Sequence, residues 1–99
     1  MNYAISGLET LTINIATAGA KQLTGKISLP RPSQGATSAS QVVTIIKQNG
    51  TTVFTSLAGA DGFAIPLLTA AADVITVALA SSQAEDEVLN AVNAVVSLS

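Results

Sequence analysis

The feature that most constrains this chain is a two-residue alternation of apolar and polar side chains. Residues 8–16 place leucine and isoleucine at alternate positions against threonine and asparagine, and a second alternating run ends at Pro30. Successive side chains of a β-strand point to opposite faces, so this period indicates half-buried strands. The stretch 30–41 is rich in Pro, Ser, Gly and Thr without periodicity, which predicts an exposed loop.

The rest of the chain continues in short apolar runs separated by turn residues. We expect further strands over 42–48, 52–56, 63–68, 74–79 and 92–98. Asn49-Gly50 predicts a two-residue hairpin, because a type I′ turn needs a positive φ at both central positions. Pro66 lacks a backbone N–H, which favours a sheet edge or a break in its strand.

About seven strands with short connections predict an all-β fold, a small antiparallel β-sandwich of immunoglobulin-like or jelly-roll type. The pattern leaves the topology within that class open. Residues 82–90 predict either a loop or one short helix capped near Ser82. At 99 residues the chain is long enough for one core, so we expect a single domain over 1–99 with an N-terminal arm at 1–7.

The composition favours a subunit whose faces are covered by neighbours, and so a homo-oligomer. Apolar residues make up 48% of the chain and charged residues only 10%, against about 25% in an average soluble protein. Few charges leave little to oppose association. A net charge of −2 disfavours nucleic-acid binding, and no apolar run or N-terminal pattern predicts a membrane span or a signal peptide.

The sequence predicts no catalytic chemistry and no cofactor. It has neither histidine nor cysteine, so the usual general base, thiol nucleophile and transition-metal ligands are missing. Its acids fall in turns and at strand ends, where solvated surface residues are expected. The run Glu85-Asp86-Glu87 could offer oxygen ligands to calcium but lacks the spaced acids and glycine of a calcium loop, so an acidic loop or helix start is the preferred interpretation.

Two strands are apolar on both faces, which points to a covered surface. In 42–48, the set Val43 and Ile45 alternates with a second apolar set, and in 74–80 both sets are again apolar or neutral. A face in water usually carries polar residues, so we expect the second sets to be covered by a neighbour or by another layer of the fold. The candidate partner-contact residues are Val42, Thr44, Ile46, Thr76 and Ala78, with Arg31 in the loop 30–41.

The aromatic residues are Tyr3, Phe54 and Phe63. Three rings are too few for a platform that stacks bases or sugars. We interpret the two phenylalanines as core side chains near the hairpin and Tyr3 as a cap at the base of the sandwich.

The stretch Gln48-Asn49-Gly50-Thr51-Thr52-Val53-Phe54-Thr55-Ser56, continued by Leu57-Ala58-Gly59-Ala60-Asp61-Gly62-Phe63, resembles small β-sandwich structural proteins of tailed bacteriophages. Ala70-Ala71-Ala72-Asp73-Val74-Ile75-Thr76-Val77, Ser81-Ser82 and Asn90-Ala91-Val92-Asn93-Ala94-Val95 extend the resemblance over about residues 42–98. It implies a non-enzymatic virion protein, such as a capsid cement or decoration subunit that binds the major capsid protein. Where such proteins often have glycine before the Asp-Val-Ile strand, this chain has Ala72.

Two alternatives remain open at this stage. The chain could be a fibre or tail component of the same particle, or a module that recognises carbohydrate or protein. A groove lined with apolar or aromatic residues would favour the recognition module. An enzyme ranks third because the groups that usually carry catalysis are missing.

Overall fold

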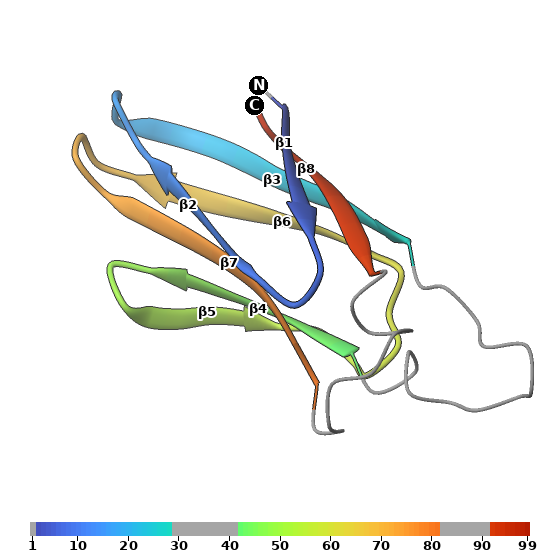
Figure 1. Ribbon diagram of the computed structural model, residues 1–99. Helices are drawn as coiled ribbons and strands as arrows, with labels where there is room; N and C mark the ends of the chain where they lie inside the picture. The colour runs from blue at the N-terminus through green and yellow to red at the C-terminus, as the bar shows by residue number, and fades with distance from the viewer. Residues whose placement is uncertain (1, 29–41, 82–91) are drawn as a thin grey trace, which may run out of the picture.

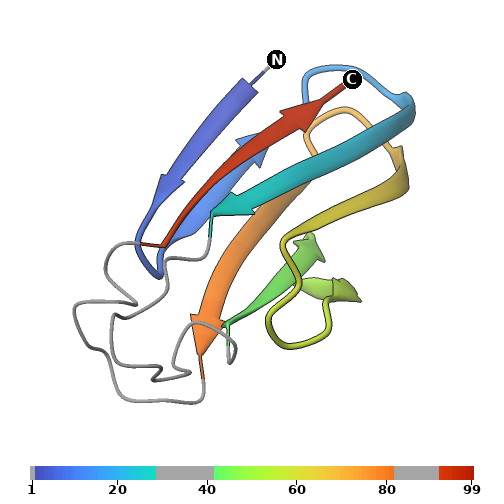
Figure 2. The same cartoon turned by 90° about the vertical axis from the view of Figure 1, so that its right-hand side faces the viewer.

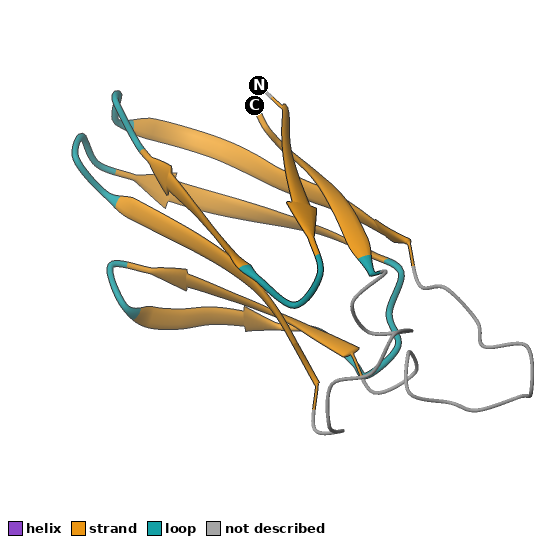
Figure 3. Cartoon of the chain, viewed as in Figure 1, coloured by secondary structure: helices purple, strands orange, loops and turns teal. Residues whose placement is uncertain are grey.

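The computed structural model describes residues 2–28, 42–81 and 92–99, and they form eight β-strands (Figure 1). The strands are β1 (Asn2–Ser6), β2 (Thr10–Asn14), β3 (Gly19–Ser28), β4 (Val42–Gln48), β5 (Thr51–Thr55), β6 (Gly62–Thr69), β7 (Val74–Ser81) and β8 (Asn93–Leu98). The predicted all-β class is confirmed, and Figure 3 shows strands joined by turns throughout these ranges. No helix within them is long and apolar enough to cross a membrane.

The strands form two four-stranded antiparallel sheets packed as layers (Figure 2). One sheet has the order β1-β8-β3-β6 and the other the order β2-β7-β4-β5. Apart from the β4-β5 hairpin, each strand is followed by a strand of the other sheet. An immunoglobulin sandwich keeps its first two strands as neighbours in one sheet, whereas eight strands in two Greek keys make a jelly roll. The strand order is therefore that of a jelly roll.

The expected N-terminal arm is instead a strand, and this is a correction to the sequence-based prediction. β1, near the N-terminus, pairs with β8, near the C-terminus, in a register that sets Asn2 opposite Ser97. Within β1 only Ile5 is fully buried, at 3% exposure, and Tyr3 is half-buried. The other face of β1 carries Asn2, Ala4 and Ser6, which have low β propensity, so the strand signal is weaker than in β2 and pairing with β8 decides its structure.

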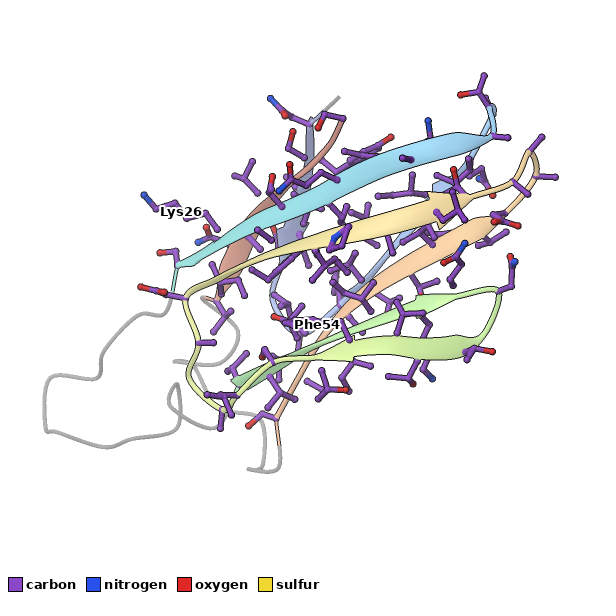
Figure 4. All side chains as sticks on the ribbon, turned by 180° about the vertical axis from the view of Figure 1, so that it is seen from behind. Lys26 and Phe54 are labelled. Carbon is purple, nitrogen blue, oxygen red and sulfur yellow. The ribbon has the colours of Figure 1, made fainter. Side chains whose placement is uncertain are left out.

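The core lies between the two sheets and is built from alternate residues of the strands, together with Ile15 and Val92 next to the ends of β2 and β8. Its buried apolar side chains are Ile5, Ile13, Ile15, Leu23, Ile27, Val42, Ile46, Ile65, Leu67, Ile75, Val77, Leu79, Val92, Ala94 and Val96. Phe54 and Phe63 pack against this core, with their ring centroids 6.1 Å apart, as expected for core side chains near the hairpin. Figure 4 shows Phe54 between the layers.

The predicted hairpin at Asn49-Gly50 is confirmed, and the next turn along the chain holds it in place. Asn49 and Gly50 have φ values of 53° and 85°, as a type I′ turn requires. Asp73, in the turn before β7, accepts hydrogen bonds from the side-chain amides of Asn49 and Gln48, each at 2.9 Å. The Val74 N–H donates to Asn49 Oδ1 at 2.8 Å. This network fixes the end of β4 relative to the start of β7.

Candidate protein interface

The outer face of the β2-β7-β4-β5 sheet carries an apolar stripe along its two central strands. We call this stripe the β4/β7 outer face, and it consists of Val43, Ile45, Val74, Thr76, Ala78 and Ala80. The register places Ile45 opposite Ala78 and Val43 opposite Ala80. All six side chains are half-buried. Its continuous apolar part is made of the rows Ile45–Ala78 and Val43–Ala80, and the polar row of Lys47 and Thr76 separates this part from Val74.

The rim of this strip is polar but almost uncharged. Thr12 of β2 lies opposite Thr76, and Thr55 of β5 lies opposite Ile45. Lys47 is exposed and occupies the same face, opposite Thr76 on one side and Thr52 on the other. Among the described residues it is the one charged side chain in these rows, so a neutral partner could cover the strip without burying many ions.

The structure corrects the sequence-based assignment of β4. Val42, Thr44 and Ile46 are 1%, 0% and 0% exposed and face the other sheet, so they belong to the core and cannot contact a partner. The second set of β4 is thus covered by the other layer of the same fold. Val43 and Ile45 occupy the outer face, which sequence reasoning missed. Both alternating sets within residues 42–46 are apolar or neutral, so the sequence gave no signal to tell the inner set from the outer one.

Sequence reasoning placed the β7 residues on the correct side. Thr76 and Ala78 lie on the β4/β7 outer face, while Ile75, Val77 and Leu79 point into the core. Their contact with a partner stays a prediction. Arg31 and the loop 30–41 lie outside the described residues, as do the proposed helix at 82–90 and the acidic run 85–87.

The opposite outer face, on the β1-β8-β3-β6 sheet, is more exposed and more mixed. Val95 on β8 is 54% exposed and Leu68 on β6 is 79% exposed. Val95 lies opposite Lys26 of β3 and Leu68 lies opposite Ala20 of the same strand. The polar side chains of Gln22 and Thr24 lie between these two positions and separate the apolar residues. Lys26, which projects from β3 in Figure 4, stands opposite Val95. This face therefore has scattered apolar residues and no continuous strip.

Among the described residues, Asp73 has a carboxyl group with an altered pKa, and the groups that alter it belong to the turn network that joins β4 and β7. The Ala70 N–H and the side chains of Asn49 and Gln48 donate to Asp73, and these hydrogen bonds lower the pKa of its carboxyl from the usual 3.8, against a smaller opposing effect of desolvation. Both oxygens already accept hydrogen bonds within the turn network. Within the described ranges, no group of three acidic side chains lies close enough to hold a metal ion.

The three aromatic side chains are all half-buried against the core. Tyr3, Phe54 and Phe63 pack on the hydrophobic cluster from three different strands. Phe63 also covers the backbone of Gly25, where an added Cβ would collide with its ring. Because the sequence contains no other aromatic residue, the chain has no aromatic platform on which a sugar ring could stack.

Comparison with known proteins supports the fold. No protein-family model and no curated protein matches the sequence. Among solved structures, rabbit GITRL superposes with a TM-score of 0.57 and 16% identity, over 88% of this chain and 69% of that one. Pika GITRL gives a TM-score of 0.52 and 14% identity, over 86% and 70%. At such low identity these likenesses show a shared two-sheet architecture and nothing about function.

Proposed function

We propose that this protein is a non-enzymatic structural subunit of a tailed-bacteriophage particle, which attaches to the capsid as a cement or decoration subunit. The β4/β7 outer face is the observation that carries the proposal. Its adjacent rows Ile45–Ala78 and Val43–Ala80 are apolar and lie on the outside of the sandwich, and Lys47 is the charge in the next row. A contiguous apolar patch with a polar rim is typical of a protein-protein contact surface.

Two further features support an attached subunit over the alternatives. Jelly-roll domains are common in viral capsids, and the resemblance over residues 42–98 comes from phage structural proteins. Sugar-binding modules usually offer exposed rings, whereas Tyr3, Phe54 and Phe63 pack against the core. The missing histidine and cysteine favour binding over catalysis.

Attachment can be tested with a matched pair of variants. Ala78→Lys introduces a charge in the middle of the β4/β7 outer face, and Ala64→Lys introduces the same charge on exposed β6 of the other sheet. Capsids lacking the protein are mixed with each purified variant, and the bound protein is measured by cosedimentation. We expect Ala78→Lys to weaken binding by about tenfold or more, because an unpaired charge at a desolvated contact costs over 1.4 kcal/mol.

The control should bind like the unmodified protein. Equal binding of both variants would show that the β4/β7 outer face is not the contact. Failure of the unmodified protein to bind capsids would overturn the cement or decoration role, and binding to isolated tails instead would assign it to the appendage.

A further inference from the structure

The two flanks of the sandwich differ in how their open strand edges are protected. β5 and β6 are the edge strands on one flank, and β1 and β2 are the edge strands on the other. An open edge offers unpaired N–H and C=O groups to any other strand, and natural proteins block it with proline, charge, bulges or side chains. The β5/β6 flank carries such devices, whereas β1 and β2 themselves contain no charged residue, proline or register shift.

On β6 the protection falls on the backbone groups that point outward. Asp61, just before β6, lies opposite Ile27 of β3, and its carbonyl accepts a hydrogen bond from Ile27 N at 2.8 Å. Hydrogen-bonded pairs recur at every second residue of an antiparallel ladder. The odd-numbered residues of β6 therefore direct their backbone groups toward β3, and the even-numbered ones direct them away from the sheet. Pro66 occupies one of the outward positions and has no N–H to offer. The outward carbonyl of Leu68 accepts a hydrogen bond from Gln48 Nε2 at 3.0 Å. The adjacent edge, β5, is interrupted by a register shift opposite Ile46 and Lys47.

On β2 the same reasoning identifies an unprotected edge. Leu79 N donates to Glu9 O at 3.1 Å and Ile15 N donates to Asp73 O at 2.9 Å, so odd-numbered residues face β7. The backbone groups of Thr10, Thr12 and Asn14 therefore point away from the sheet. These three residues are exposed, and β2 contains no charged residue, proline or register shift.

β2 is better suited to receive a strand than β1, the other edge of this flank. Its sequence Thr-Leu-Thr-Ile-Asn is rich in β-branched residues, whereas the outward positions of β1 are Asn2, Ala4 and Ser6, which have low β propensity. Leu11 of β2 is half-buried although it packs against the core. A strand added beside β2 would cover the exposed part of Leu11.

We propose that β2 pairs antiparallel with β2 of a second copy of this chain, about a twofold axis at Thr12. The proposal rests on the proposed function as an assembling subunit and names one of its contacts. An antiparallel edge is complementary to itself, so a second copy supplies the matching donors and acceptors. Thr10 pairs with the partner's Asn14, Thr12 pairs with the partner's Thr12, and the two β2-β7-β4-β5 sheets become one continuous sheet.

The register of this pairing gives the number of hydrogen bonds and the approximate area of the contact. Three outward residues on each strand form about six backbone hydrogen bonds across the axis. On the inner side Leu11 meets the partner's Ile13, and on the outer side the two Thr12 side chains stand about 5 Å apart. One strand pair buries much less than the roughly 800 Å² per partner of a stable interface. The contact is therefore weak between free subunits and becomes effective when both copies are also attached to one particle.

The twofold register gives a sharp test by charge swapping. Thr12→Lys and Thr12→Glu each place like charges opposite each other on the axis, so each variant alone should lose self-association measured by sedimentation at about 1 mM protein. An equimolar mixture should recover it, because lysine then faces glutamate. Thr52→Lys puts the same charge on the same sheet face at the opposite edge, and this control should associate like the unmodified protein.

Hydrogen exchange on the unmodified protein provides a second readout that needs no variant. The amides of Thr10, Thr12 and Asn14 should become protected as concentration rises, while those of Leu11 and Ile13 stay protected throughout. A monomer at every concentration, association unaffected by Thr12→Lys, or no recovery in the mixture would each overturn the proposal. Capsid binding is measured separately with Ala78→Lys, so loss of the β2 pairing and loss of the decoration role give different results.

Discussion

In the two central strands of the β2-β7-β4-β5 sheet, β4 and β7, the inner and outer faces carry similar types of residue and have different roles. Thr44 of β4 and Thr76 of β7 illustrate this, because both interrupt a run of aliphatic residues in neighbouring central strands. Thr44 is 0% exposed and points into the core, whereas Thr76 is half-buried on the outside. An apolar sequence on both faces of a strand therefore specifies burial without specifying what covers each face.

The largest expected effect is the difference in stability between a lysine placed on the inner face of the sheet and a lysine placed on the outer face. Thr44→Lys buries an ammonium group without a partner, which should cost at least about 4 kcal/mol and unfold most of a small domain. Thr76→Lys should leave the fold intact, because lysine can extend from the outer face into water. Circular dichroism with thermal melting measures both. A folded Thr44→Lys protein with an unchanged melting temperature would contradict the assignment of Thr44 to the core.

The hydrogen bonds of Asp73 keep β4 and β7 in the register on which this comparison depends. Its pKa is lower in the folded protein than the ordinary 3.8, so its stabilising effect is complete above that pH and is lost as the pH falls through the folded pKa. We expect Asp73→Asn to lower the melting temperature at pH 7 and to make it fall less steeply below pH 4.

Asp61→Asn, in an exposed turn, is the control for Asp73. Melting curves between pH 2 and 7 compare the two variants with the unmodified protein, a range that covers ordinary carboxyl pKa values. Equal acid sensitivity of the unmodified protein and Asp73→Asn would show that the network does not stabilise the turn.

Ala72 carries backbone strain in the turn that aligns β7 with β4. Its φ is +70°, in the left-handed region that favours glycine, and its N–H donates to Ile15 O at 2.9 Å. Ala72→Gly should therefore raise the free energy of unfolding by about 1 kcal/mol. Ala71→Gly, at the neighbouring exposed position without positive φ, should give no gain. Chemical denaturation measures the difference, and a destabilised Ala72→Gly protein would count against the strain.

The smallest expected effect concerns the hydroxyl of Thr44. Its Oγ1 is buried and has no hydrogen-bond partner among the described residues. Thr44→Val should leave stability unchanged or raise it by up to about 1 kcal/mol. Thr69 is also buried, but its hydroxyl donates to Gly19 O at 3.1 Å, so Thr69→Val should cost about 1 kcal/mol. Similar losses in both variants would indicate that the Thr44 hydroxyl has a partner after all.

Local chemistry was sufficient to predict several elements of this fold. The Asn49-Gly50 hairpin follows from the φ values that a type I′ turn demands, and the edge position of Pro66 follows from its missing N–H. The strands with clear alternation, such as β2, were predicted because one face is polar and the other is not. In each case the determining interaction lies within a few residues of the chain.

Long-range contact decided the rest. β1 exists because β8, more than eighty residues away, supplies its hydrogen-bond partner. In β4 the sequence determined that residues 42–46 are uncharged on both faces, but only the opposing sheet decided that Val42, Thr44 and Ile46 are core and that Val43 and Ile45 are surface. The physical reason is that alternation encodes a difference between two faces, and a strand with two apolar faces has no such difference until another layer covers one of them.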